Sequence, residues 1–327
     1  MQDIVDMLQA LPHDITPGPA GPDLAAADVA RGHQAVRQRR RRRLAAVAGA
    51  AAVGAAAAVL VATPGPRSAA PAAAGAGAGD SAHRASAGPS LMTLAADVAA
   101  LPRPKGDATL VERETGAPGQ QSVNVWDLYA DNGQYFFSQT EAGLPAQVKN
   151  DDNQGDGQFG REVAAATYAV TGNLDAAVVK MAWPYPTPVP AWVSAQVKNM
   201  KAGGTQIDNY VWENSEDALI AGSGNPQVRA GVLRLVSALP GITITHGTVD
   251  GQPALTLTAG ADELGYTGID KANPKVETGP ALHEAITINA QTGIPLGVTS
   301  STAGKDLGSV TYVVTRVSLT GIAAGKF

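Results

Sequence analysis

The side chains that most often carry catalytic or metal chemistry are scattered through this sequence. No two of the five histidines (His13, His33, His83, His246 and His283) stand at a metal-ligand spacing, and the chain has no cysteine. A Cys-based zinc module and a thiol enzyme are therefore excluded. His246 and His283 fall in predicted strands that a sheet could bring together, although ordinary hydrogen-bonded strand histidines are the simpler interpretation. No Gly-x-Ser-x-Gly motif of a hydrolase is present. The sequence predicts no catalytic residue, no cofactor and no metal.

A glycine-rich acidic segment, Asp151 to Glu162, matches two ligand-binding motifs only in part. Gly155, Gly157 and Gly160 form a Gly-x-Gly-x-x-Gly pattern. The residues before it are polar rather than those of a hydrophobic strand, so dinucleotide binding is not predicted. As a twelve-residue calcium loop the segment has Asp156 where the sharp turn requires glycine. We therefore expect a flexible acidic loop.

Three aromatic residues in a proline-rich stretch are the candidates for a ligand cavity. Trp183, Tyr185 and Trp192 alternate with the prolines of 184–190, which favour an extended polyproline-like backbone. One interpretation is that these three side chains line the mouth of an apolar pocket that binds a ligand. The alternative is that they simply pack against the domain.

The strongest pattern of the sequence is a run of arginines followed by an apolar segment. Arg37, Arg39, Arg40, Arg41, Arg42 and Arg43 precede a stretch of 19 residues from Leu44 to Ala62 without any charge. At about 1.5 Å per residue such a helix spans roughly 30 Å, the thickness of the hydrocarbon core of a bilayer. We predict a transmembrane helix over 44–63. A buried alanine-rich helix, a cleaved signal peptide and a twin-arginine export signal are the alternatives.

Charge asymmetry predicts the orientation of this helix. The arginine run lies on its N-terminal side, and no Lys or Arg follows until Arg67. By the positive-inside rule, residues 1–43 lie in the cytoplasm and the C-terminal part lies outside the cell membrane. Residues 1–36 have two short helical patterns, which are too small to bury a core alone. This segment is therefore either a solvated leader or the binding site of a cytoplasmic regulatory protein. The net charge of −5 excludes a general nucleic-acid binder.

The rest of the chain divides into a linker and a domain. Residues 64–90 are almost entirely Ala, Gly, Pro and Ser, the composition of a flexible linker. Helical patterns follow over 91–101, 165–183 with a break at Gly172, 207–221, and from Pro226 onward. Alternating segments with hairpin turns at 131–133, 250–251 and 292–293 predict antiparallel strands. For residues 91–327 we expect an α+β fold, an antiparallel sheet with helices packed on one face.

This order of elements, ending in the hairpin ITINAQTGIPL (286–296), is similar to the LolA-like half-barrel of lipoprotein carriers and envelope sensors. The stretch Val228 to Thr258 resembles a family of uncharacterised actinobacterial single-pass proteins, often encoded beside an extracytoplasmic-function sigma factor. The resemblance implies regulation or ligand sensing across the membrane. It departs from zinc-binding anti-sigma domains, because residues 1–43 contain no cysteine and are too few to wrap a sigma factor.

Three functions are compatible with these patterns. The first is a membrane regulator or sensor that is not an enzyme, with a ligand or partner outside the membrane and a partner for residues 1–36 inside. The second is a tethered module that binds a lipid or a lipoprotein, which predicts a large apolar cavity under the sheet. The third, a secreted hydrolase, would need clustered carboxylates or a nucleophile–base pair, and the sequence offers no convincing one.

Overall fold

The computed structural model describes residues 87–116, 118–119, 121–155, 157–184, 205–260, 282–302 and 305–327. The predicted cytoplasmic segment, transmembrane helix and most of the linker lie outside the described residues. None of the described helices is long and apolar enough to cross a membrane. The first described helix, α3 (Ala87–Ala99), begins four residues earlier than the start predicted at residue 91, inside the predicted linker.

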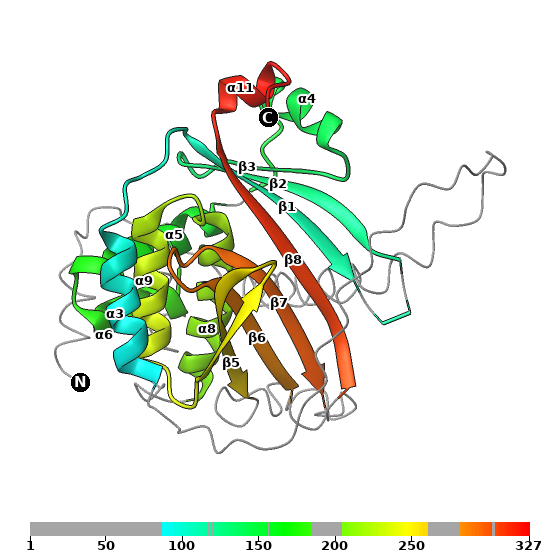
Figure 1. Ribbon diagram of the computed structural model, residues 1–327. Coiled ribbons are helices and arrows are strands. Elements are labelled where there is room, and N and C mark those ends of the chain that lie inside the picture. Colours follow the sequence, from blue (N-terminus) through cyan, green and yellow to red (C-terminus); the bar gives the residue numbers. More distant parts are fainter. Residues whose placement is uncertain are drawn as a thin grey trace, which may run out of the picture.

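Eight antiparallel strands form one open sheet, in the order β3-β2-β1-β8-β7-β6-β5-β4 (Figure 1). The strands are β1 (Ala108–Gly116), β2 (Val123–Ala130), β3 (Tyr135–Ser138), β4 (Thr243–Val249), β5 (Gln252–Gly260), β6 (Leu282–Asn289), β7 (Pro295–Thr302) and β8 (Lys305–Val317). Consecutive hairpins account for most of the pairs, as the turn residues predict. The first strand, β1, and the last strand, β8, pair with each other in the middle of the sheet, with Ala108 opposite Val317.

Five helices cover one face of this sheet: α3, α5 (Gln158–Thr171), α6 (Leu174–Ala182), α8 (Thr205–Ala221) and α9 (Pro226–Ser237). Helix α9 contacts both α3 and α5, and α8 contacts α5, α6 and α9. Asn225 caps α9, because its side chain accepts the N–H of Gln227. The α+β class and the antiparallel sheet predicted from the sequence are confirmed.

The main core lies between the five helices and alternate residues of the strands. Leu257, Ile286 and Val298 point from three neighbouring strands toward the helices, where Trp212 and Leu233 are fully buried. Each such residue is opposite the next in the register, so they form one apolar row across the sheet. This core fixes the positions of the turns that join the helices.

The prediction that the helices pack on one face is incomplete. Two short helices, α4 (Leu144–Lys149) and α11 (Leu319–Ala323), form a second core on the other face with Leu110, Leu128 and Phe136. Strand β1 explains this, because both Leu110 and its neighbour Val111 are buried, on opposite faces of the sheet. Figure 1 shows α4 and α11 beside the β1–β3 end of the sheet, away from the five other helices.

Candidate functional site

A cleft of about 240 Å³ lies between the β2–β3 turn, the start of α5, the α8–α9 turn and the segment that follows α3. The β2–β3 turn contributes Asp131 and Gln134, the start of α5 contributes Phe159, and the α8–α9 turn contributes Asn225. Arg103, which follows α3, and Tyr129 of β2 complete the principal polar and aromatic lining. Ligand pockets for drug-sized molecules usually have volumes of about 300–1,000 Å³, so this cleft suits a single small group.

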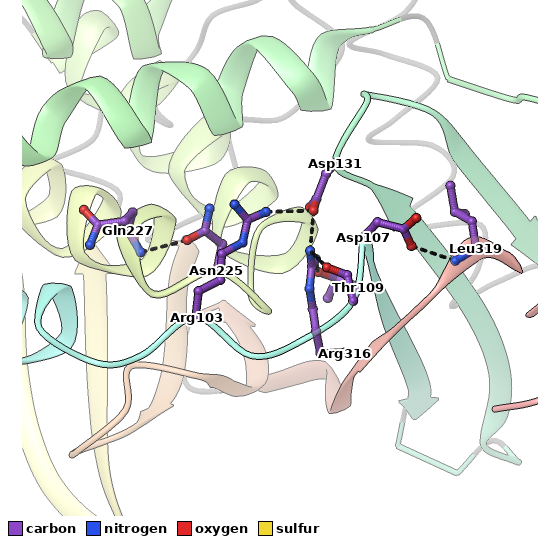
Figure 2. A network of polar contacts seen from close by, with 9 residues as sticks. Arg103, Asp107, Thr109, Asp131, Asn225, Gln227, Arg316 and Leu319 are labelled. Carbon is purple, nitrogen blue, oxygen red and sulfur yellow. Dashed lines mark hydrogen bonds and ion pairs between the residues drawn. The ribbon is translucent and has the colours of Figure 1, made fainter. Parts of the chain in front are cut away.

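Asp131 is the centre of the polar side of this cleft. Its carboxylate oxygen Oδ2 accepts hydrogen bonds from Arg103 Nη2 at 2.7 Å and from Arg316 Nη2 (Figure 2). The backbone holds Asp131 in place, because its N–H donates to the carbonyl of Asp107 at 2.8 Å. One carboxylate thus lies between two permanently charged guanidinium groups.

The two arginines differ in their surroundings. The Arg316 side chain is only 6% exposed, whereas that of Arg103 is 52% exposed. Arg316 also donates to Thr109 Oγ1 at 3.1 Å and to the carbonyl of Gly106 at 2.9 Å. Arg316 is therefore fixed within the structure, and Arg103 is the cation that solvent and a ligand can reach.

The α8–α9 turn packs directly on Arg316. A Cβ atom at Gly224 would lie 2.6 Å from Thr109 Oγ1 and 2.8 Å from Arg316 Cδ, both closer than side chains tolerate. Glycine at this position lets the turn approach the polar network. The turn that contains Gly222 and Gly224 is thus a structural part of the cleft wall, which Gly222 lines.

The aromatic side of the cleft is formed by Tyr129 and Phe159, with Tyr135 beside them. The ring centroids of Tyr129 and Tyr135 are 5.0 Å apart, and Phe159 lies 5.2 Å from each. These distances are typical of favourable aromatic contacts. Burial and then the neighbouring Asp127 carboxylate raise the pKa of the Tyr129 hydroxyl well above its ordinary value. Tyr129 therefore stays neutral near pH 7 and cannot act as a base.

A partly buried ion pair between Arg113 and Asp127 lies next to the aromatic side of the cleft. Asp127 is 1% exposed and accepts hydrogen bonds from Arg113 Nε at 3.0 Å and from the Tyr135 hydroxyl at 2.7 Å. Because Asp127 and Tyr135 lie on neighbouring strands on the same side of the sheet, the bond fixes the Tyr135 ring. The cleft is thus built from rigid elements and combines an accessible cation with an aromatic wall.

The chemistry that this arrangement supports is binding. A carboxylate could contact Arg103, while an apolar or aromatic group packs on Phe159. No histidine lines the cleft. Among the described residues, no group of three His, Cys, Asp or Glu side chains could hold a metal ion.

Of the candidate residues from the sequence, only Trp183, His246 and His283 are among the described residues. Trp183 is partly buried and its ring contacts that of Tyr210 at a tilt, with centroids 4.9 Å apart, so Trp183 packs beside the core and is not part of the cleft lining. Tyr185, Trp192 and the arginines of 37–43 lie outside the described residues. His246 and His283 do not meet, because β5 separates their strands and their register positions place them on opposite faces of the sheet.

The predicted flexible acidic loop over 151–162 is wrong in its second half. Helix α5 begins at Gln158, and Glu162 is fully buried within it. Gly157 adopts a positive φ of 77° immediately before the helix, a conformation that glycine allows. The glycine pattern therefore marks a helix start.

Comparisons with family models, with curated proteins and with solved structures give no significant match.

Proposed function

We propose that this chain is a single-pass membrane protein whose α+β domain lies outside the membrane and regulates or senses. The observation that carries the proposal is the order of segments in the sequence. An arginine run, an uncharged segment of 19 residues and an Ala/Gly/Pro linker precede one folded domain. Residues 1–36 would then bind a regulatory protein in the cytoplasm, in a role related to sigma-factor signalling.

The cleft supports recognition as the role of the outer domain. It is preformed, because Asp131 and Arg316 are fixed by contacts to the backbone and to Thr109. Its lining includes one accessible cation, Arg103, and the ring of Phe159. We propose that it binds a small acidic group, either of a free ligand or of a partner protein, with no chemical step.

We also propose that the sheet is a variant of the LolA-like half-barrel. The single open antiparallel sheet, with five helices covering one face and only the short α4 and α11 on the other, supports this assignment. In the described part the space under the sheet is filled by side chains such as Trp212, Leu233 and Leu257, each less than 2% exposed. This filled interior favours a regulator over the lipid-binding alternative, which needs a large apolar cavity.

The test couples the two ends of the protein. A photo-reactive amino acid at Gln34 of the full chain in its native membrane should cross-link a cytoplasmic protein. Arg103→Glu should then change the cross-linking yield, because it reverses the accessible charge of the outer cleft. Lys105→Glu is the matched control, since Lys105 is an exposed neighbouring cation that does not line the cleft. Equal cross-linking yields from the unchanged chain, Arg103→Glu and Lys105→Glu would refute a signal between the cleft and the N-terminal segment.

A further inference from the structure

The two edges of the sheet differ in how their backbone groups are satisfied. At the β3 edge, the N–H of Tyr135 donates to Asn153 Oδ1 at 3.0 Å, and its carbonyl accepts the N–H of Gln154 at 2.8 Å. The loop after α4 therefore covers this edge. At the other edge, β4 has no neighbouring strand among the described residues on its outer side, and Thr243 and residues 245–248 are exposed.

The sequence and the register of strand β4 also lack the features that commonly protect an edge. Its sequence Thr-Ile-Thr-His-Gly-Thr-Val has no Lys, Arg, Asp, Glu or Pro, and its register with β5 is unbroken by a bulge. Natural edge strands commonly use charge, proline or bulges to prevent pairing with another chain. A long, regular and uncharged edge is a template for a further strand.

The turn after β4 determines which backbone groups point outward. Asp250 and Gly251 both have positive φ, 49° and 77°, as in a two-residue type I′ hairpin. In such a hairpin the pair that closes the turn, here Val249 and Gln252, exchanges hydrogen bonds, and pairs alternate from there. Ile244, His246 and Thr248 consequently direct their N–H and C=O groups away from β5.

A glycine adds specificity to this edge. A Cβ atom on Gly247 would meet no other atom within 4 Å, so the strand leaves open space there. The residue paired with Gly247 on β5 is Ala254, which is also small. Large aromatic side chains on a neighbouring strand fill such a gap beside an edge glycine.

We propose that β4 binds an extended, uncharged segment of a partner protein as a ninth strand, with an aromatic side chain over Gly247. Backbone hydrogen bonds supply affinity in this mode, and alternate side chains supply specificity. A second copy of the chain fits less well, because a stable dimer buries about 1,000 Å² of surface and has an apolar centre that the surroundings of β4 would have to supply. None of the exposed large hydrophobic side chains of the described residues lies on β4 or β5. The surface is independent of the cleft, which is formed by other connections.

The test measures binding of a short synthetic peptide to the full chain in detergent. The probe alternates threonine and valine around a central tyrosine, with a lysine at each end. We expect saturable binding that His246→Pro weakens about tenfold or more. Proline removes one outward N–H, which an edge strand tolerates. His246→Ala, which keeps that N–H, should bind normally. Gly247→Thr should weaken the tyrosine peptide but not its alanine counterpart.

Two peptide variants keep the test independent of protein folding. N-methylation of alternate residues blocks backbone hydrogen bonds on one side of the probe only, so one of the two methylated sets should lose binding and the other should retain it. Loss in neither set, or equal affinity of His246→Pro and His246→Ala, would overturn the proposal. So would a dimer of the full chain in sedimentation that His246→Pro dissociates, because the edge would then belong to a second copy.

Discussion

Arg316 and Asp131, which are 185 positions apart in the chain, form an ion pair that joins the last strand to the β2–β3 turn. The buried guanidinium of Arg316 and the exposed one of Arg103 share this carboxylate. We predict that Asp131→Asn lowers the free energy of unfolding by about 1–3 kcal/mol, because it weakens a charged hydrogen bond to a buried group. Urea denaturation of the detergent-solubilised chain measures this.

Arg103→Gln provides the comparison for Asp131→Asn. The pair of Arg103 with Asp131 is largely exposed, and such pairs contribute about 0–1 kcal/mol. An equal loss from the two variants would show that the buried Arg316 is not the main partner of Asp131.

Gly231 is a close-approach position between α9 and α5. A Cβ atom there would lie 1.7 Å from the carbonyl oxygen of Ala166, so alanine must push the two helices apart. We predict that Gly231→Ala lowers the unfolding free energy by about 2–3 kcal/mol despite the better helix propensity of alanine. Gly160→Ala in α5 is the control: its nearest contact is an ordinary 3.5 Å, and it should gain up to about 1 kcal/mol. A neutral Gly231→Ala would contradict the close packing.

Arg229 is a buried cation held by two backbone carbonyls. Its Nε donates to the carbonyl of Thr292 at 2.7 Å, and its Nη1 donates to that of Ser223. Burial lowers the pKa of its guanidinium to about 10. Arg229→Lys cannot reach both carbonyls with one ammonium in the same geometry, so we predict a loss of about 1–3 kcal/mol. A thermal melt that shows no change would mean that these bonds do not link α9 to the two turns.

Asp208 gives a prediction for pH dependence. It is 5% exposed, and burial raises the pKa of its carboxyl group above the ordinary value. An acid with a raised folded-state pKa destabilises the fold when ionised, and this penalty disappears as the pH falls through that pKa. Asp208→Asn should therefore raise stability at pH 7, and the gain should shrink toward pH 4.

The control for Asp208 is Asp175→Asn. Asp175 also lies in the first turn of a helix, but it is exposed. Its replacement should slightly lower stability at pH 7, because the carboxylate interacts favourably with the helix N-terminus. If Asp208→Asn and Asp175→Asn gave the same pH profile, burial would not be the cause.

The elements of the domain were predictable where the signal is local. The apolar stripe of α9 and the turns around Asp250 and Thr292 depend on residues close together in sequence, and their elements appear as expected. The pairing of β1 with β8 was not predictable, because the two strands are separated by most of the domain. The short α4 and α11 have only one or two turns, too few for a periodic pattern.

The cleft was not predictable for a related reason. Arg103, Asp131 and Arg316 come from three distant segments, and the sequence around each one does not distinguish it from an ordinary surface charge. Asp131 carries a turn signal with Asn132 and Gly133, and nothing in the sequence adds a binding role. The one local signal for the cleft wall is the pair of glycines at positions 222 and 224, where the structure shows that a Cβ atom would clash with neighbouring side chains.

The most direct test of the account is the location of the two ends of the chain. Because the protein has no cysteine, single cysteines at Gln34 and Lys326 report their surroundings without background. In intact protoplasts, a membrane-impermeant maleimide should label Lys326→Cys, and it should label Gln34→Cys only after the membrane is opened. Labelling of Gln34→Cys alone, or of neither position before lysis, would contradict a domain held outside the membrane.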